Sequence, residues 1–289
     1  MNKPGIEDYR RFYAEEIAAV TALRSPALVE AFAKVPREHF LGPGPWKVAG
    51  PDLGMGPSMK YRETDGADPR HIYHNVVVVI DEKRNLNNGH PSTLASWIDR
   101  LEIAPGEHMF HVGAGLGYYT AILSELVGDT GRVTAIEVDA DLAARARENV
   151  AAWPNVDMHA GDGGEFDPGP VDAIFINAGV THPRALWLDR LRDGGRMLLP
   201  LTFDVGGGIG KGVMMLVKRE GERFSARLLT LVMIYSSTSV RDAEMNAALG
   251  KQISSPKIFS VAALRRDAHG EEGTCWLHGK DFCFSQRAV

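Results

Sequence analysis

Long apolar runs, a strong net charge and cysteine-rich motifs are all missing from this 289-residue chain. No apolar run approaches the roughly eighteen residues that a membrane span needs, and residues 1–8 lack the apolar core of a secretory signal. The net charge is −5 with both signs interspersed, so no extended field favours nucleic acid or a membrane as a partner. The composition is that of an ordinary globular protein, and we expect a cytoplasmic location.

Potential metal ligands are sparse in the sequence. The chain has two cysteines, Cys275 and Cys283, which we predict to be free thiols rather than a disulfide or a metal clip. The ten histidines are scattered, and the tightest pair, His71 and His74, has no cysteine or carboxylate cluster beside it. We therefore predict no metal site.

The first two thirds of the chain show regular apolar patterns. Helical spacing covers residues 6–23 and 26–34, and a Gly- and Pro-rich connection at 42–70 precedes a strand-like run at 75–80. Further predicted helices are 92–101, 118–127, 140–152 and 183–191, and predicted strands are 108–112, 132–137, 156–159, 171–176 and 196–200. This alternation implies an α/β fold with a doubly wound, mostly parallel sheet.

The pattern changes after residue 200. Strand-like runs at 213–218 and 227–234 predict an antiparallel hairpin. The glycine-rich stretch 206–212 is predicted to be a mobile loop, because Val205 and Gly212 replace residues that a phosphate loop requires. A predicted helix at 243–249 and strands at 258–264 and 274–284 would form a β-rich extension. We thus expect an N-terminal helical and loop region (1–91), an α/β core (92–235) and an extension (236–289).

A glycine-rich turn is the most informative motif of the chain. Residues 111–120 read HVGAGLGYYT, and a dinucleotide site would need glycine where Tyr118 stands. Gly113, Gly115 and Gly117 instead allow a ligand to approach the backbone, with its anionic end toward a helix start. Glu137 follows 20 positions after Gly117, at the end of the next predicted strand. S-adenosylmethionine offers a carboxylate and a ribose diol, so we predict it as the cofactor; a tight turn without a ligand is the alternative.

Together with VPREHF at residues 35–40, GDG at 161–163 and GGR at 194–196, this motif resembles the protein-L-isoaspartate O-methyltransferase family. That family belongs to the class I S-adenosylmethionine-dependent methyltransferases, and the similarity covers residues 6–235. The resemblance implies a Rossmann-like fold and methyl transfer. The last fifty or so residues are not explained by it.

The resemblance also implies a role for each residue of the motif. The three glycines of the turn would line the methionine portion, and Glu137 would accept hydrogen bonds from the ribose hydroxyls. Asp162 and Gly163 would border the adenine, with a solvated carboxylate and a plain turn glycine as the alternatives. The family begins its glycine motif with an acidic residue where this chain has His111, so binding of the methionine amino group would be organised differently.

The acceptor region departs from the family pattern. Family members share a Thr-Ile-Ser-x-Pro segment whose hydroxyls help to hold the isoaspartyl carboxylate, whereas residues 85–93 here read NLNNGHPST. With Pro91 aligned, Gly89 replaces the serine and Asn87 the threonine. Losing a hydroxyl at a site that hydrogen-bonds its substrate is a large penalty. We therefore expect a small molecule or a modified peptide as the methyl acceptor.

Three polar residues are candidates for catalysis. His90 titrates near neutrality and follows Asn88, which would orient a polar acceptor; a helix-start histidine bonded to backbone is the alternative. Asn177, at the end of a predicted strand, would contact cofactor or acceptor, or else form a turn. Tyr118 would wall the cofactor or pack in the core.

Three functions stay open at this point. The first is an O-methyltransferase with an altered acceptor segment. The second is a genuine repair enzyme in which Asn87, Asn88 and Ser92 replace the missing hydroxyls, and the third is a non-catalytic S-adenosylmethionine-binding protein. The C-terminal extension would cap the acceptor pocket or form a homodimer contact.

Overall fold

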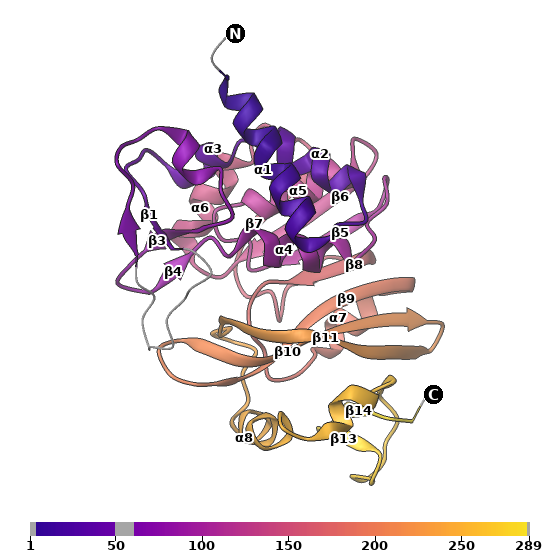
Figure 1. The fold of residues 1–289 in the computed structure, drawn as a ribbon. Coiled ribbons are helices and arrows are strands. Elements are labelled where there is room, and N and C mark those ends of the chain that lie inside the picture. Colours follow the sequence, from indigo (N-terminus) through magenta and orange to yellow (C-terminus); the bar gives the residue numbers. More distant parts are fainter. Residues whose placement is uncertain (1–3, 50–60, 288–289) are drawn as a thin grey trace. The chain divides into compact units, whose positions relative to one another are not determined.

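The computed structural model describes residues 4–49 and 61–287 (Figure 1). The chain forms two compact units that interleave along the sequence. The first unit consists of Met1–Gly106, Ala114–Val133 and Asp139–His159, and the second of Glu107–Gly113, Thr134–Val138 and Ala160–Val289. Within the described ranges, no helix has both the length and the apolar character needed to cross a bilayer.

The first unit contains most of the helices. Ser25 Oγ accepts a hydrogen bond from the Leu28 amide at 3.2 Å, and Pro26 takes the first helical position, where no N–H is needed. The rings of Tyr13 and Phe32 pack edge to face, with centroids 6.1 Å apart. The helices of this unit are α1 (Ile6–Thr21), α2 (Pro26–Lys34), α3 (Arg37–Leu41), α4 (Pro91–Asp99), α5 (Tyr118–Val127) and α6 (Ala140–Asn149). Those over 6–23, 26–34, 92–101, 118–127 and 140–152 were predicted from the sequence.

A small antiparallel sheet, in the order β2-β1-β3-β4, also belongs to the first unit. Its strands are β1 (Lys47–Ala49), β2 (Arg62–Glu63), β3 (Val77–Asp81) and β4 (Leu86–Asn87). The connection expected at 42–70 thus contains two strands and the start of the 3-10 helix η1 (Pro69–Ile72); its residues 50–60 lie outside the described ranges. Strands of two or three residues are too short to show a period of two in the sequence.

The strands of the second unit follow the order β13-β14-β12-β11-β10-β9-β8-β5-β6 within a large sheet. Strand β8 (Val171–Ile176) is parallel to β5 (His108–Val112) and to β9 (Leu191–Asp204), which confirms the α/β architecture expected from the alternating pattern. From β9 to β14 the neighbouring strands are antiparallel, so the sheet as a whole is mixed. Strand β6 (Arg132–Glu137) has its predicted bounds. Strand β7 (Val156–Ala160) is one residue longer than the strand predicted at 156–159.

The antiparallel hairpin predicted after residue 200 is confirmed, and its strands are longer than expected. Strands β10 (Ile209–Glu220) and β11 (Arg223–Tyr235) stay paired along their length, with Glu220 opposite Arg223 at the turn (Figure 1). The prediction of a loop over all of 206–212 is wrong, because Gly210 and Gly212 lie within β10. A Cβ on Gly212 would be 1.9 Å from the Leu201 carbonyl oxygen, so glycine allows β9 and β10 to pair there.

The C-terminal part adds two helical segments and three short strands. Helix α8 (Ala243–Gln252) confirms the helix predicted at 243–249. Helix α7 (Ala185–Arg190), which lies earlier, before β9, confirms the one predicted at 183–191. The strand expected at 258–264 is wrong over its first half, which lies in the 3-10 helix η2 (Pro256–Ser260), where Pro256 favours a helix start. Strands β12 (Ala263–Arg265), β13 (Cys275–His278) and β14 (Cys283–Ser285) complete the sheet.

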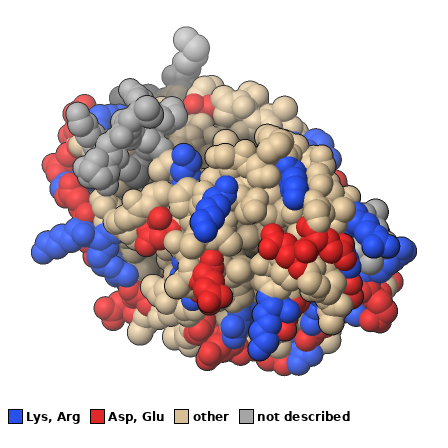
Figure 2. Space-filling view, turned by 90° about the horizontal axis from the view of Figure 1, so that it is seen from below, with Lys and Arg blue, Asp and Glu red and all other residues tan. Residues whose placement is uncertain are grey.

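On the face in Figure 2, acidic and basic side chains lie side by side.

Candidate functional site

Three predicted site residues lie at the ends of neighbouring strands in the second unit. Gly113 follows β5, Asn177 follows β8, and Glu137 ends β6. The Asn177 amide donates to the Val112 carbonyl oxygen at 2.8 Å, and the Gly113 amide donates to the Ile136 carbonyl oxygen at 2.9 Å. Ligands of doubly wound sheets bind beyond the carboxyl ends of the strands. The structure therefore brings Gly113, Glu137 and Asn177 together where a ligand is expected.

Asp162 lies in the loop that follows β7. The Gly161 amide donates to the Glu137 carbonyl oxygen at 2.9 Å. Asp162 Oδ1 accepts hydrogen bonds from the Gly164 amide at 2.8 Å and from Ser239 Oγ at 2.6 Å. The carboxylate thus ties this loop to the segment before α8 and is more than a solvated loop residue.

Gly163 is required by packing beneath the same loop. A Cβ at this position would be 2.5 Å from Val112 Cγ1 and 3.0 Å from Ile136 Cγ2, which is too close for any larger residue. Trp187 Nε1 donates to the Gly163 carbonyl oxygen at 2.8 Å and fixes the backbone. Close packing is therefore sufficient to explain the glycine, and its contact with adenine stays a prediction.

The rest of the glycine turn lies in the first unit, at the start of α5. Gly117 is the N-cap residue with a φ of +89°, and a Cβ there would be 2.8 Å from Val150 Cγ1. Gly115 has a φ of +58°, and no atom lies within 4 Å of the position of a Cβ. Gly117 is thus needed for packing, whereas Gly115 leaves open space beside a helix start, whose amides favour an anionic group.

Two predicted cofactor residues have buried side chains. Tyr118 packs edge to face against Phe32 and Phe40, with centroids 6.3 and 5.5 Å away, and burial raises its pKa well above the ordinary value. His111 stacks on Phe175 in the neighbouring strand at 5.1 Å, and burial lowers its pKa to about 3. Packing accounts for both side chains, and their contact with the cofactor remains a prediction.

Side-chain hydrogen bonds to backbone shape the acceptor segment, residues 85–92. Asn87 Oδ1 accepts from the Gly89 amide at 2.9 Å, and Asn88 Oδ1 accepts from the Val78 amide at 2.8 Å. Gly89 itself has a φ of +77°, and a Cβ there would be 2.9 Å from Leu94 Cδ2. The backbone at position 89 is therefore one that a residue with a side chain adopts only under strain.

His90 is oriented by a short chain of polar side chains. It is the N-cap residue of α4, and its Nδ1 lies 3.0 Å from Ser92 Oγ rather than bonding to backbone. Asn75 Nδ2 donates to Ser92 Oγ, and the Ser92 amide donates to Asn75 Oδ1, each at 3.0 Å. Among the described residues, Nε2 of His90 and Nδ2 of Asn88 are buried without a hydrogen-bond partner. A side-chain movement that exposes them would let a polar ligand bond to either atom.

Arg37 is a residue whose role the sequence did not reveal. Its fully buried guanidinium donates to the carbonyl oxygens of Val76 at 2.7 Å and of His74 at 3.1 Å, so it clamps the chain before β3. Burial, and secondly the charge of Arg37, lower the pKa of His90. The imidazole of His90 is therefore neutral at neutral pH. The motif at 35–40 contained this arginine, but nothing in the sequence indicated the carbonyls that it contacts.

A pocket of about 550 Å³ borders the start of the acceptor segment in the first unit. Its wall includes Leu86 and the turn before it, together with the first turn of α6. Arg84 and Asp139, both in the wall, form an ion pair at 2.7 Å. On this side the acceptor segment is surrounded by polar side chains, some positively and some negatively charged, which suits a polar ligand.

Comparison with known proteins decides the family. The family described as Protein-L-isoaspartate(D-aspartate) O-methyltransferase (PCMT) matches residues 66–240, more than half of the chain. The chain belongs to this family. Relatives named protein-L-isoaspartate O-methyltransferase include one from Ignicoccus hospitalis, 28% identical over 70% of this chain and 85% of its own length, and one from Aeropyrum pernix, 30% identical over 68% and 71%. A further relative from Thermotoga maritima is 27% identical over 62% of this chain, and the match spans only 51% of that relative.

Solved structures support the fold. A protein-L-isoaspartate O-methyltransferase superposes with a TM-score of 0.64 at 20% identity, over 84% of this chain and 69% of that one. A Plasmodium falciparum member in complex with S-adenosyl-L-homocysteine gives a TM-score of 0.58 at 16% identity, over 78% and 97%. As a member of the PCMT family, the chain is a methyltransferase with S-adenosylmethionine as its cofactor.

Proposed function

We propose that this PCMT-family methyltransferase methylates an oxygen of a small molecule or a modified peptide, bound at residues 85–92. The observation that carries the proposal is the conformation of Gly89, which stands where the family pattern has a hydroxyl-bearing serine. Its φ of +77° and the 2.9 Å approach of a Cβ to Leu94 oppose a side chain at this position. Such strain costs on the order of 1–3 kcal/mol.

The neighbouring asparagines do not replace the missing hydroxyls in this proposal. Their side-chain oxygens already accept hydrogen bonds from the amides of Gly89 and Val78. The buried side-chain atoms of the segment that lack a partner are Nδ2 of Asn88, a donor, and Nε2 of His90. This arrangement favours a methyl-accepting substrate that carries, beside the oxygen to be methylated, an atom able to accept a hydrogen bond.

The residues at the strand ends and at the start of α5 suit the cofactor. S-adenosylmethionine supplies a methyl group activated by a sulfonium charge. The open space at Gly115 and the amides of the helix start would hold its carboxylate, and Glu137, 8% exposed, would accept from the ribose hydroxyls. The loop of Asp162 and Gly163 would border the adenine, and Asn177 would lie near the methyl group.

His90 would serve acceptors whose oxygen carries a proton. If the Nδ1–H of His90 donates its hydrogen bond to Ser92 Oγ, Nε2 of the neutral imidazole is unprotonated and can accept a proton. The acceptor proton would then move to Nε2 while the oxygen forms its bond to the methyl carbon, the bond from that carbon to the sulfonium sulfur breaks, and the neutral thioether leaves. A carboxylate acceptor needs no base, and His90 would only position it.

The experiment is a methyl-transfer screen with labelled S-adenosylmethionine against metabolite and modified-peptide pools, with labelled products identified by mass spectrometry. A labelled product whose formation requires His90 but not the exposed His74 supports the proposal. Labelling that His90→Gln and His74→Gln leave equally intact would place the acceptor elsewhere.

Protein repair is the second candidate function, and the names of the relatives favour it. It predicts that the enzyme methylates an isoaspartyl peptide but not its aspartyl twin.

A homodimer contact through the C-terminal extension remains a prediction.

A further inference from the structure

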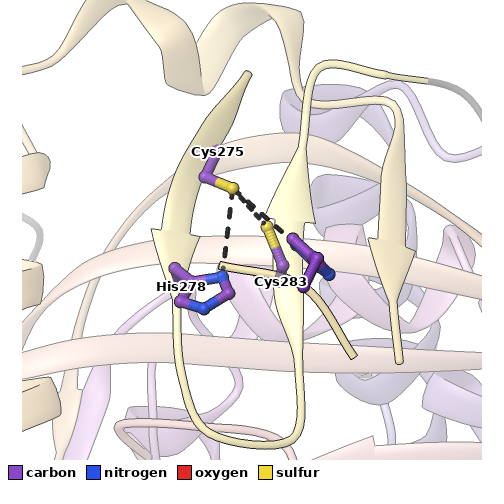
Figure 3. A group of neighbouring side chains, drawn as sticks. Cys275, His278 and Cys283 are labelled. Carbon is purple, nitrogen blue, oxygen red and sulfur yellow. Dashed lines mark hydrogen bonds between the residues drawn. The ribbon is translucent and has the colours of Figure 1, made fainter. Parts of the chain in front are cut away.

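Four potential metal ligands converge in the C-terminal extension, far along the chain from the methyltransferase motifs. They are the Sγ atoms of Cys275 and Cys283 and one ring nitrogen each of His269 and His278, and all four atoms lie within 4.8 Å of one another. Figure 3 shows Cys275 and His278 on one strand and Cys283 on the strand beside it, with their side chains directed toward one another.

The distances suit a tetrahedral ion. The two Sγ atoms are 3.0 Å apart, and Cys275 Sγ lies 3.9 Å from His269 Nε2 and 3.9 Å from His278 Nδ1. Bonds of about 2.3 Å to sulfur and about 2.0 Å to nitrogen place tetrahedral ligand atoms about 3.3–3.8 Å apart. The two sulfurs would have to move apart and the other ligand atoms move together, each by under about 1 Å, to surround one ion.

The contacts outside the cluster also suit a metal site. His269 Nδ1 lies 2.8 Å from the Asp267 carbonyl oxygen, so its proton is held there and the lone pair of Nε2 faces Cys275. The Glu272 amide donates to Cys275 Sγ at 3.3 Å, which stabilises a thiolate. Arg265 pairs with Asp267 and Glu272 and so braces the loop that carries His269.

We propose that His269, Cys275, His278 and Cys283 form a structural Zn²⁺ site. Two thiolates and two neutral imidazoles make the tetrahedral S₂N₂ set that Zn²⁺ prefers, and they neutralise its charge in a buried place. Four protein ligands leave no open position, so the ion would hold the loop after β12 against β13 and β14 rather than take part in methyl transfer.

A disulfide is the competing interpretation of the two cysteines. It would account for the close Sγ atoms but not for the two imidazoles that face them. Cys283 lies opposite His278 in the β13–β14 pair, and Cys275 lies opposite Ser285, so the sulfurs are not on directly paired residues. The cluster as a whole is explained by a metal.

The test is metal analysis of the full-length protein, purified under reducing conditions without chelator. We expect one zinc per chain in the wild type and in His74→Gln, and a loss of at least tenfold in bound zinc in Cys283→Ser and His278→Gln. Cobalt exchanged into the wild type should give the intense visible bands of tetrahedral thiolate coordination, and both thiols should become reactive only after chelation.

The cobalt spectrum and the thiol reactivity use the wild type, so they decide the question even if a variant does not fold. Protein without zinc whose two cysteines are joined by a disulfide would overturn the proposal. So would zinc that stays bound in both ligand variants, or a cobalt spectrum without thiolate bands. None of these outcomes depends on the methyl acceptor.

Discussion

The strand ends of the second unit and the acceptor segment of the first unit are positioned by different means. At Gly113, Asn177 and Gly161 the backbone itself makes the hydrogen bonds, so little depends on side chains. Around residues 85–92 the side chains of asparagine, serine and histidine hold the chain and one another. A backbone scaffold tolerates sequence change around a fixed ligand, whereas a network of side chains changes its ligand when one member changes.

The largest expected effect is on methyl transfer in the acceptor segment. For an acceptor whose oxygen carries a proton, His90→Gln should lower kcat/KM on the order of 10²-fold, because proton removal is lost. The affinity for S-adenosylmethionine, measured by calorimetry, should stay unchanged. The matched control is His74→Gln, an exposed histidine of the same unit; equal rates in both variants would remove His90 from the mechanism.

The next effect is on cofactor binding at the glycine turn. Gly115→Ala should weaken S-adenosylmethionine binding roughly tenfold or more. The alanine side chain would occupy the open space in which we expect the ligand to bind. Gly128→Ala is the matched control at the other end of α5, since Gly128 also has positive φ and open space around it. Equal cofactor affinities of the two variants would show that Gly115 does not border the ligand.

A smaller effect is expected on stability at Gly89. Gly89→Ser should lower the free energy of unfolding by about 1–3 kcal/mol without creating isoaspartyl methylation. Gly42→Ser provides the comparison, because Gly42 has a similar φ of +68° but no atom near its Cβ position. Urea unfolding of both variants separates backbone strain from the contact with Leu94. A Gly89→Ser enzyme of wild-type stability would contradict the strain argument.

The last prediction concerns the pH dependence of stability and His111. Burial lowers its folded pKa to about 3, so below about pH 6.5 the unfolded chain binds a proton that the folded chain does not. Stability should therefore fall with decreasing pH, by up to about 1.4 kcal/mol per unit from this group. His111→Phe should remove this part of the slope in denaturation series at several pH values, and His74→Phe should not. An unchanged slope in His111→Phe would mean that the folded imidazole is protonated.

Much of the cofactor side could be predicted from the sequence. Strands β5, β6 and β8 and helix α5 have the predicted bounds, because strand ends and helix starts depend on local apolar pattern and on glycine. The structure also places Gly113, Glu137 and Asn177 together, as the end-of-strand rule implied. It does not decide whether Tyr118 and His111 touch the cofactor, because their burial is a property of packing that the sequence motif does not contain.

The features that sequence reasoning missed depend on partners distant in the chain. Arg37 acts through carbonyls at Val76 and His74, and Ser92 acts through Asn75; neither pair has a recognisable spacing. The histidines beside Cys275 and Cys283 were missed for the same reason, because their spacing follows no common zinc motif. Strand pairing, rather than local order, brings these side chains together.

The most direct test of the central claim is to measure kcat/KM of the wild type for an isoaspartyl peptide and for its aspartyl twin, with saturating S-adenosylmethionine confirmed by calorimetry. We predict that the cofactor binds and that the isoaspartyl peptide is methylated no faster than its twin, because the segment at Gly89 lacks the hydroxyl that would hold it. Selective methylation of the isoaspartyl peptide would contradict the account and would establish repair as the function.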